Sequence, residues 1–224
     1  VGGIGLGIAM ISFIYSITNT TAAITLLCLA AMPFFTALLA FLFLKEKISL
    51  NVWISMLIAT VGIIIMAVGN TEKNSLIGFV FGLTSSIGFS IFSVTLRWRK
   101  ETPKFTTVAV AGLFCFITAT IMILVNKQPF FATSYNSAMF SLHGVLVCLG
   151  LILYSIGSKA IQAAELTLLS LTEVIGGIFW VWLPLFGINE IPSTNTIVGG
   201  FFLFVSLIYY SLIMRWNKRY IALN

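Results

Sequence analysis

The chain has 224 residues, of which 59% are hydrophobic and 8% charged, and its mean hydropathy is +1.10. This composition excludes a soluble domain with an ordinary polar surface and is typical of a protein that crosses a membrane several times. The formal net charge of +6 does not indicate a nucleic-acid partner, because the basic residues lie at the ends of hydrophobic segments, where they set topology. The three cysteines have no CxxC spacing and predict neither a disulfide framework nor a zinc site.

Hydropathy and turn residues predict an all-α integral membrane protein with eight spans, each near the ~20 residues that cross a bilayer. The chain opens with valine inside an apolar stretch, so we expect it to be truncated at its N-terminus. The expected spans are 1–17, 22–44, 51–69, 76–96, 105–125, 139–157, 164–187 and 196–214.

Lysine and arginine are distributed unequally between the two sides of these spans. One set of connections, together with the C-terminal end, holds ten basic residues, whereas the opposite set holds only Lys73 and Lys127. The positive-inside rule therefore assigns the basic side and the C-terminus to the cytoplasm. The ten residues are Lys45, Lys47, Arg97, Arg99, Lys100, Lys104, Lys159, Arg215, Lys218 and Arg219.

Small residues four apart mark two packing faces. Gly3 and Gly7 have GxxxG spacing in the first span, and Gly78 and Gly82 have it in the fourth. Such glycines let helix backbones approach closely in lipid.

A proline interrupts the second span at Met32-Pro33-Phe34-Phe35. Proline frees a backbone carbonyl group and bends the helix, which membrane helices tolerate where neighbouring groups or water satisfy that carbonyl. Pro33 either shapes a cavity or makes a purely structural bend.

The seventh span carries Glu173 near its middle. An ionised acid in hydrocarbon costs about 2.5–3.5 kcal/mol on insertion scales, so intramembrane acids normally face a bundle interior or a wet cavity. Glu173 is accordingly the first candidate for substrate or proton binding, the alternative being a structural hydrogen bond to a neighbouring helix. Thr172 adds a hydroxyl beside it, and Gly176-Gly177 offers a bare backbone to a ligand or to another helix.

Three further residues are secondary candidates. Glu165 lies eight positions before Glu173, at the start of the same span; on one continuous helix the two acids border one cavity, although the helix dipole alone also favours an acid there. Lys159 is the expected partner of Glu165. Trp180 either stacks a ligand or anchors the outer interface, and His143 either carries protons or is a structural donor.

The chain contains an internal repeat, visible when Glu46 is aligned with Glu190. Residues 33–49 then align with residues 177–193, and each copy is a long apolar span, an acid, a hydroxyl residue three positions later, and another span. The two copies cross the membrane in opposite directions. Inverted repeats are typical of secondary transporters, which bind substrate near the midplane.

One stretch runs from Leu29-Ala30-Ala31-Met32-Pro33 to Glu46-Lys47-Ile48-Ser49, and a second runs from Ala163-Ala164-Glu165 to Glu190-Ile191-Pro192-Ser193. The two stretches resemble the paired signatures of the drug/metabolite transporter superfamily, EamA-type. The resemblance implies a ten-helix bundle of two inverted five-helix repeats, with cytoplasmic termini and a central cavity. This chain would supply eight of the ten helices: residues 1–69 the last three of the first repeat, residues 76–214 the second repeat, and residues 215–224 a cytoplasmic basic tail. One branch of the family has both acids but a proline at the position of Ile178, so we expect a straighter helix here.

The resulting hypothesis is a secondary permease in a bacterial inner membrane that moves a small organic metabolite or drug, coupled to a proton or solute gradient. No nucleotide-binding motif indicates an ATP-driven pump. The alternatives are a channel or a non-transport membrane subunit, and a membrane-embedded transferase. The transferase is disfavoured because one histidine, no aspartate and no HExxH motif leave little for acid–base or metal chemistry. We therefore expect no catalytic residues, metal or cofactor, with the lipid bilayer and a small solute as partners.

Overall fold

The computed structural model describes residues 1–20, 22–69, 76–98, 104–130, 133–182 and 194–222, and their regular secondary structure is entirely helical. Four helical segments are long and apolar enough to cross a membrane: Gly2–Asn19, Leu76–Trp98, Phe105–Val125 and Ser134–Gly157. Shorter apolar helical segments run over Met32–Leu44, Leu50–Ile65 and Ile197–Tyr210. The predicted class, an all-helical membrane protein, is thereby confirmed.

The helices lie along the predicted spans, but the spans expected at 22–44 and 164–187 are each divided into shorter helices, so the predicted count of eight is not confirmed. They are α1 (Gly2–Asn19), α2 (Ala22–Leu29), α3 (Met32–Leu39), the π-helical turn η1 (Ala40–Leu44), α4 (Leu50–Gly69), α5 (Leu76–Trp98), α6 (Lys104–Val125), α7 (Ser134–Gly157), α8 (Ala163–Leu169), α9 (Leu171–Trp182) and α10 (Thr194–Ala222).

Two helices extend clearly beyond their predicted bounds. Helix α7 begins at Ser134 rather than at residue 139, because the Thr133 hydroxyl caps it by accepting a hydrogen bond of 3.4 Å from the backbone N–H of Asn136. Helix α10 continues to Ala222, so most of the predicted basic tail extends this helix.

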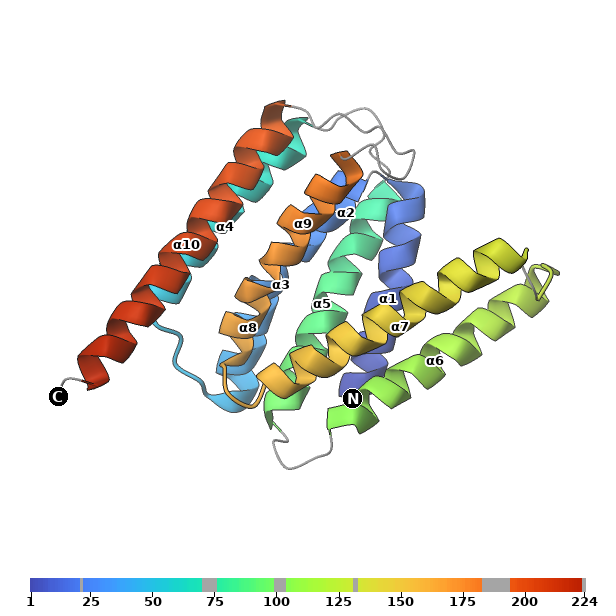
Figure 1. Cartoon of the computed structure of the whole chain (residues 1–224), viewed down its shortest axis with the longest axis horizontal. Helices are drawn as coiled ribbons and strands as arrows, with labels where there is room; N and C mark the ends of the chain where they lie inside the picture. Colours follow the sequence, from blue (N-terminus) through green and yellow to red (C-terminus); the bar gives the residue numbers. More distant parts are fainter. Residues whose placement is uncertain (21, 70–75, 99–103, 131–132, 183–193, 223–224) are drawn as a thin grey trace.

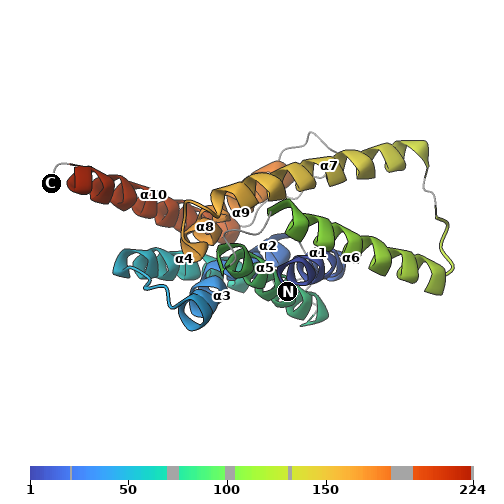
Figure 2. The ribbon, with the colours of Figure 1, turned by 90° about the horizontal axis from the view of Figure 1, so that it is seen from below.

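The helices form two connected packing groups (Figure 1). Helices α4 and α10 lie side by side at one edge, and the α2–α3 and α8–α9 pairs lie between them and α5. One apolar core joins α2, α3, α4, α8, α9 and α10, and a second joins α1, α5 and α6. Helices α6 and α7 extend away from the rest (Figure 2), and Ser155 is the buried residue that α7 contributes.

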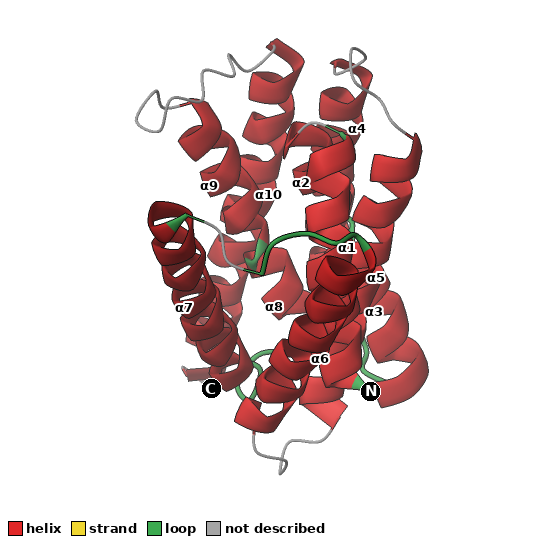
Figure 3. Cartoon of the chain, turned by 90° about the vertical axis from the view of Figure 1, so that its right-hand side faces the viewer, coloured by secondary structure: helices red, strands yellow, loops and turns green. Residues whose placement is uncertain are grey.

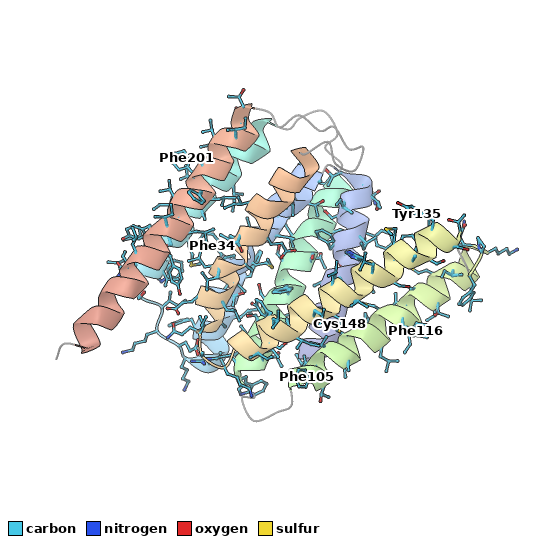
Figure 4. All side chains as sticks on the ribbon, viewed as in Figure 1. Phe34, Phe105, Phe116, Tyr135, Cys148 and Phe201 are labelled. Carbon is cyan, nitrogen blue, oxygen red and sulfur yellow. The ribbon has the colours of Figure 1, made fainter. Side chains whose placement is uncertain are left out.

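Aromatic side chains cover the outer faces of the bundle (Figure 4). Phe105 and Phe116 on α6 are 57% and 68% exposed, and Phe201 on α10 is 63% exposed. Large apolar side chains exposed along whole helices suit contact with lipid. Phe34, by contrast, is partly buried against the first core.

The glycine pairs form packing faces, as predicted. A Cβ atom on Gly3 or Gly7 would lie 2.7 Å or 2.5 Å from side-chain atoms of α6. A Cβ atom on Gly78 would lie 2.8 Å from a side chain at the end of α1, and one on Gly82 would lie 2.7 Å from a side chain of α2. These positions therefore admit only glycine at the present helix separations.

The backbones of helices α1 and α5 come into direct contact at a pair that the GxxxG pattern does not identify. A Cβ atom on Gly88 would lie 2.6 Å from the carbonyl oxygen of Gly5, and one on Gly5 would lie 3.0 Å from the carbonyl oxygen of Gly88. The buried Ser85 hydroxyl donates a hydrogen bond of 2.8 Å to the carbonyl oxygen of Ala9 across the same interface. Close backbone contact and interhelical hydrogen bonds both hold helices together in lipid.

Candidate functional site

The predicted second span is interrupted near its middle. Helix α2 ends at Leu29 and α3 begins at Met32, with Pro33 in its first turn. Pro33 has no N–H group to donate to the carbonyl oxygen of Leu29, so the regular helical ladder cannot continue through this point. The bend expected at Pro33 is thus a break between two half-helices, and Pro33 itself is buried.

Two serines of α5 hydrogen-bond to the backbone on either side of this break. The Ser86 hydroxyl donates to the carbonyl oxygen of Cys28, at the end of α2. The Ser90 hydroxyl lies 3.2 Å from the carbonyl oxygen of Met32, at the start of α3. Both serines are fully buried, so side chains of a neighbouring helix satisfy backbone groups at the break, as a membrane interior requires.

The predicted seventh span is broken as well, at Ser170 between α8 and α9. The Ser170 hydroxyl donates to the carbonyl oxygen of Thr167 (2.7 Å), and the Thr172 hydroxyl donates to that of Leu169 (2.9 Å). Hydroxyl side chains that bond to nearby carbonyl groups compete with the helical ladder. The expectation that Glu165 and Glu173 share one continuous helix was therefore wrong, since they lie on two half-helices.

The two broken helices pack against each other in halves. Helix α3 contacts α8, and α2 contacts α9, so the two interruptions lie in neighbouring elements. Figure 1 shows α8 beside α3 and α9 beside α2, and Figure 3, turned by 90°, shows α9 above α8 and α2 above α3. Residues on both sides of both breaks, including Leu29, Met32, Leu168 and Leu171, belong to one apolar core.

Glu173 lies in the first turn of α9, immediately after the second break. Glu173 and Thr172 are exposed, whereas Leu171 and Val174 are buried, so α9 turns its apolar side to the core and its polar side away from it. Within the described part of the chain, the Glu173 carboxylate has no hydrogen-bonded or ion-paired side chain. A carboxylate at this place is favoured by the positive end of the α9 dipole and is free to bind a ligand.

The two glycines after Glu173 have different surroundings. A Cβ atom on Gly176 would meet nothing within 4 Å, whereas one on Gly177 would lie 3.0 Å from the side chain of Leu26 on α2. Gly177 therefore permits the close packing of α2 on α9, and Gly176 borders open space on the same helix. Trp180 belongs to α9, and its side chain lies outside the described residues.

Glu165 has partners that differ from the expected one. Its carboxylate interacts with the hydroxyl of Tyr210 on α10 and lies within electrostatic range of Glu46 and Arg97. Lys159, which we expected as its partner, is exposed and instead uses its backbone carbonyl oxygen to accept a hydrogen bond of 3.2 Å from Arg97. The Arg97 contact with Glu46 joins residues 51 positions apart, and no local pattern in the sequence identifies it.

His143 lies on α7 and is exposed. Helix α7 packs mainly on α6, rather than on the broken helices. Among the described residues, no three His, Cys, Asp or Glu side chains are grouped as metal ligands. The repeat residue Glu190 lies outside the described residues.

Comparison with known proteins finds similarity to one transporter family and to proteins named as transporters. Residues 1–68 match the EamA-like transporter family. A Helicobacter pylori protein named as an uncharacterized transporter is 28% identical over 58% of this chain and 44% of its own length. A Clostridium kluyveri protein with the same name is 24% identical over 93% of this chain and 69% of its own length. The Pseudopaline exporter CntI of Pseudomonas aeruginosa is also 24% identical, over 93% of this chain and 72% of its own length.

A solved crystal structure has a similar fold. It superimposes on 95% of this chain and 77% of its own with a TM-score of 0.71, at 18% sequence identity. The chain spans less than half the length of the Helicobacter pylori relative, at 44%. Residues 1–68 thus match the EamA-like transporter family, and relatives named as transporters align along 93% of the chain, so this chain is similar to EamA-like membrane transporters.

Proposed function

We propose that this protein is a secondary active transporter that moves a small organic metabolite or drug across the cytoplasmic membrane by alternating access. Glu173 binds a proton or a cationic or amine group of the solute, and Thr172 and Gly176 border the same site. Transport is coupled to a proton or solute gradient. Pro33 and Gly177 shape the site indirectly, by setting the break in the first broken helix and the approach of α2 to α9.

The position of Glu173 carries this proposal. It is an unpaired, exposed acid among the described residues, in the first turn of a half-helix that packs against a second broken helix. Discontinuous helices in transporters place half-helix ends at the midplane, where substrate and coupling ions bind. An intramembrane acid without a structural partner is functional by default.

The proposed architecture is two inverted repeats, with residues 1–69 belonging to the first and residues 76–214 to the second. The two broken pairs support this, because each proposed repeat contains one span interrupted near its middle, α2–α3 in the first and α8–α9 in the second, and the two pairs pack against each other in halves. The excess of lysine and arginine at the connections of one side supports a multi-pass orientation with the C-terminus in the cytoplasm.

The relatives support the class of substrate. The Pseudomonas aeruginosa relative is named as an exporter of pseudopaline, which favours a small organic solute for this chain as well. A channel is the second candidate and is less favoured, since discontinuous helices where two repeats meet are typical of secondary transporters. A transferase is disfavoured because Glu173 has no acid–base partner among the described side chains.

The test is solute flux in proteoliposomes under an imposed pH gradient, with a panel of labelled amino acids, amines and nucleosides. The protein is compared with Glu173→Gln, which keeps the side-chain shape and removes the charge. Glu72→Gln is the matched control, since it makes the same change in a connecting segment between two apolar spans.

Gradient-driven flux of at least one solute is expected for the wild type and for Glu72→Gln, and its loss is expected for Glu173→Gln. Flux that Glu173→Gln leaves unchanged, in a protein with normal gel-filtration behaviour, would reduce Glu173 to a structural role. Absence of flux for every solute in the wild type would count against the transporter class.

A further inference from the structure

A half-buried ion pair joins elements that are distant in sequence at the basic end of the bundle. The Arg97 side-chain Nε donates to Glu46 Oε1 at 2.9 Å, and the two side chains are 16% and 17% exposed. A second guanidinium nitrogen of Arg97, Nη1, donates to the backbone carbonyl oxygen of Lys159 at 3.2 Å. One arginine at the end of α5 thus ties the η1–α4 connection to the α7–α8 connection.

The local backbone directs Glu46 toward this contact. Lys45 ends η1 in the left-handed conformation, with φ of 53°. The N–H groups of Lys45 and Glu46 both donate to the carbonyl oxygen of Ala40. A left-handed residue with such bonds closes a helix end tightly, so the acid leaves η1 in a fixed direction rather than on a loose loop.

A small apolar contact joins the same parts of the chain as the ion pair. Ala40, Val94 and Ala163 form one buried cluster, with 0%, 6% and 2% exposure. Ala40, the first residue of η1, lies six positions before Glu46, and Val94 lies three positions before Arg97 on α5. Ala163, the first residue of α8, lies four positions after Lys159. The ion pair and this buried apolar contact therefore hold together the same three segments: η1 with its connection to α4, the end of α5, and the start of α8 with the connection before it.

A second acid lies near the pair. Glu165 on α8 lies within electrostatic range of Arg97 and Glu46, and it interacts with the Tyr210 hydroxyl of α10. Arg97 thus has two acids around it, one in direct contact and one nearby. Removing Arg97 would leave two like charges facing each other, which opposes closure.

We propose that the Arg97–Glu46 ion pair is the latch of a gate at this end of the bundle, and that the Ala40–Val94–Ala163 contact is the seal that it holds shut. This inference rests on the proposed alternating access. Opening toward the basic side separates α5 and α8 from η1, breaks the pair and gives solution on the basic side access to Thr172 and Glu173 on α9. The latch is weak enough to release in each cycle, because a partly exposed ion pair contributes little stability.

The test measures how fast a cysteine beyond the seal reacts with a membrane-impermeant maleimide applied from the Arg97 side. The probe is Thr172→Cys, on the exposed side of α9, in a background whose three cysteines are replaced by serine. Lys47→Cys in the same background shows which face of the vesicle the reagent reaches, because Lys47 is exposed beside the latch.

Glu46→Gln and Arg97→Gln are each expected to raise the labelling rate of the probe about two- to tenfold, the range that a partly buried pair supports. Lys47→Gln, which removes a charge next to the pair without breaking it, is expected to leave the rate unchanged. Exchanging the partners, with Glu46→Arg and Arg97→Glu together, is expected to return the rate toward that of the parent.

The proposal that the ion pair is a latch would be contradicted by equal labelling rates in the parent, Glu46→Gln and Arg97→Gln, provided that all three behave normally in gel filtration. A rise that Lys47→Gln reproduces would also overturn it, since the effect would then follow the net charge of this end. Labelling needs no solute, so its result is independent of whether flux is found in the test of the proposed function.

Discussion

Replacing Gly88 by alanine is expected to separate α1 from α5. A Cβ atom at this position would lie 2.6 Å from the carbonyl oxygen of Gly5, whereas ordinary contact begins near 3.4 Å, so the helices must part by about 0.8 Å. A gap of that size forfeits about a quarter to a half of the dispersion attraction across the local contact. It also stretches the hydrogen bond from Ser85 to Ala9, now 2.8 Å, toward about 3.6 Å, at which the bond is lost.

Overpacking costs about 1–3 kcal/mol, and the lost hydrogen bond adds about 0.5–1.5 kcal/mol. The higher helix propensity of alanine stabilises the folded state by up to about 1 kcal/mol relative to glycine, which offsets part of this loss. The net destabilisation is thus about 1–3 kcal/mol, which lowers the unfolding midpoint of a chain of this size by about 3–10 °C.

The assay is thermal unfolding in detergent, followed by tryptophan fluorescence. Gly150→Ala on α7 is the matched control, because a Cβ atom there meets nothing within 4 Å, and its midpoint should stay level or rise slightly. Equal midpoints for Gly88→Ala and Gly150→Ala would refute the argument that backbone contact between α1 and α5 holds this interface together.

Three further substitutions test other contacts by the same unfolding assay. Ser86→Ala removes the hydroxyl that donates to the carbonyl oxygen of Cys28 at the first break, and a loss of about 1–2 kcal/mol is expected; an unchanged midpoint would contradict this. Gly62→Ala should cost about 1–3 kcal/mol, because its Cβ atom would lie 2.5 Å from a backbone carbonyl oxygen of α10, whereas Gly200→Ala meets nothing and should be neutral. Thr36→Val should be neutral or stabilising, since the buried Thr36 hydroxyl has no partner among the described residues; a loss above about 1 kcal/mol would show that the hydroxyl is paired.

Hydropathy predicted where most helices lie, because about 20 apolar residues between polar turns allow little else in a membrane protein. The break at Pro33 was also predictable, since proline lacks the N–H group that a helix interior needs. The break at Ser170 was not, because serine and threonine interrupt a helix only when their hydroxyls bond locally, and the sequence does not decide that choice. The same uncertainty explains why Glu165 and Glu173 were wrongly placed on one helix.

Contacts between distant elements were the least predictable part of the candidate site. The GxxxG pattern identified Gly3, Gly7, Gly78 and Gly82, but the contact between backbones at Gly5 and Gly88 depends on where two helices cross. Pairing of Arg97 with Glu46 likewise depends on the ends of three elements meeting at one place. Periodicity within one helix carries no information about either contact.

The most direct measurement of the central claim is counterflow in proteoliposomes loaded with an unlabelled solute that the protein carries. Alternating access predicts that labelled solute added outside accumulates inside transiently, above its equilibrium level. The carrier brings labelled solute in, but the site that returns outward is occupied mostly by unlabelled solute from the internal pool. Glu173→Gln should abolish this accumulation if the acid binds the solute, and should retain it without gradient coupling if the acid binds only the proton. A labelled solute that enters the wild-type vesicles only up to equilibrium, whatever their internal load, would contradict the carrier and favour a channel.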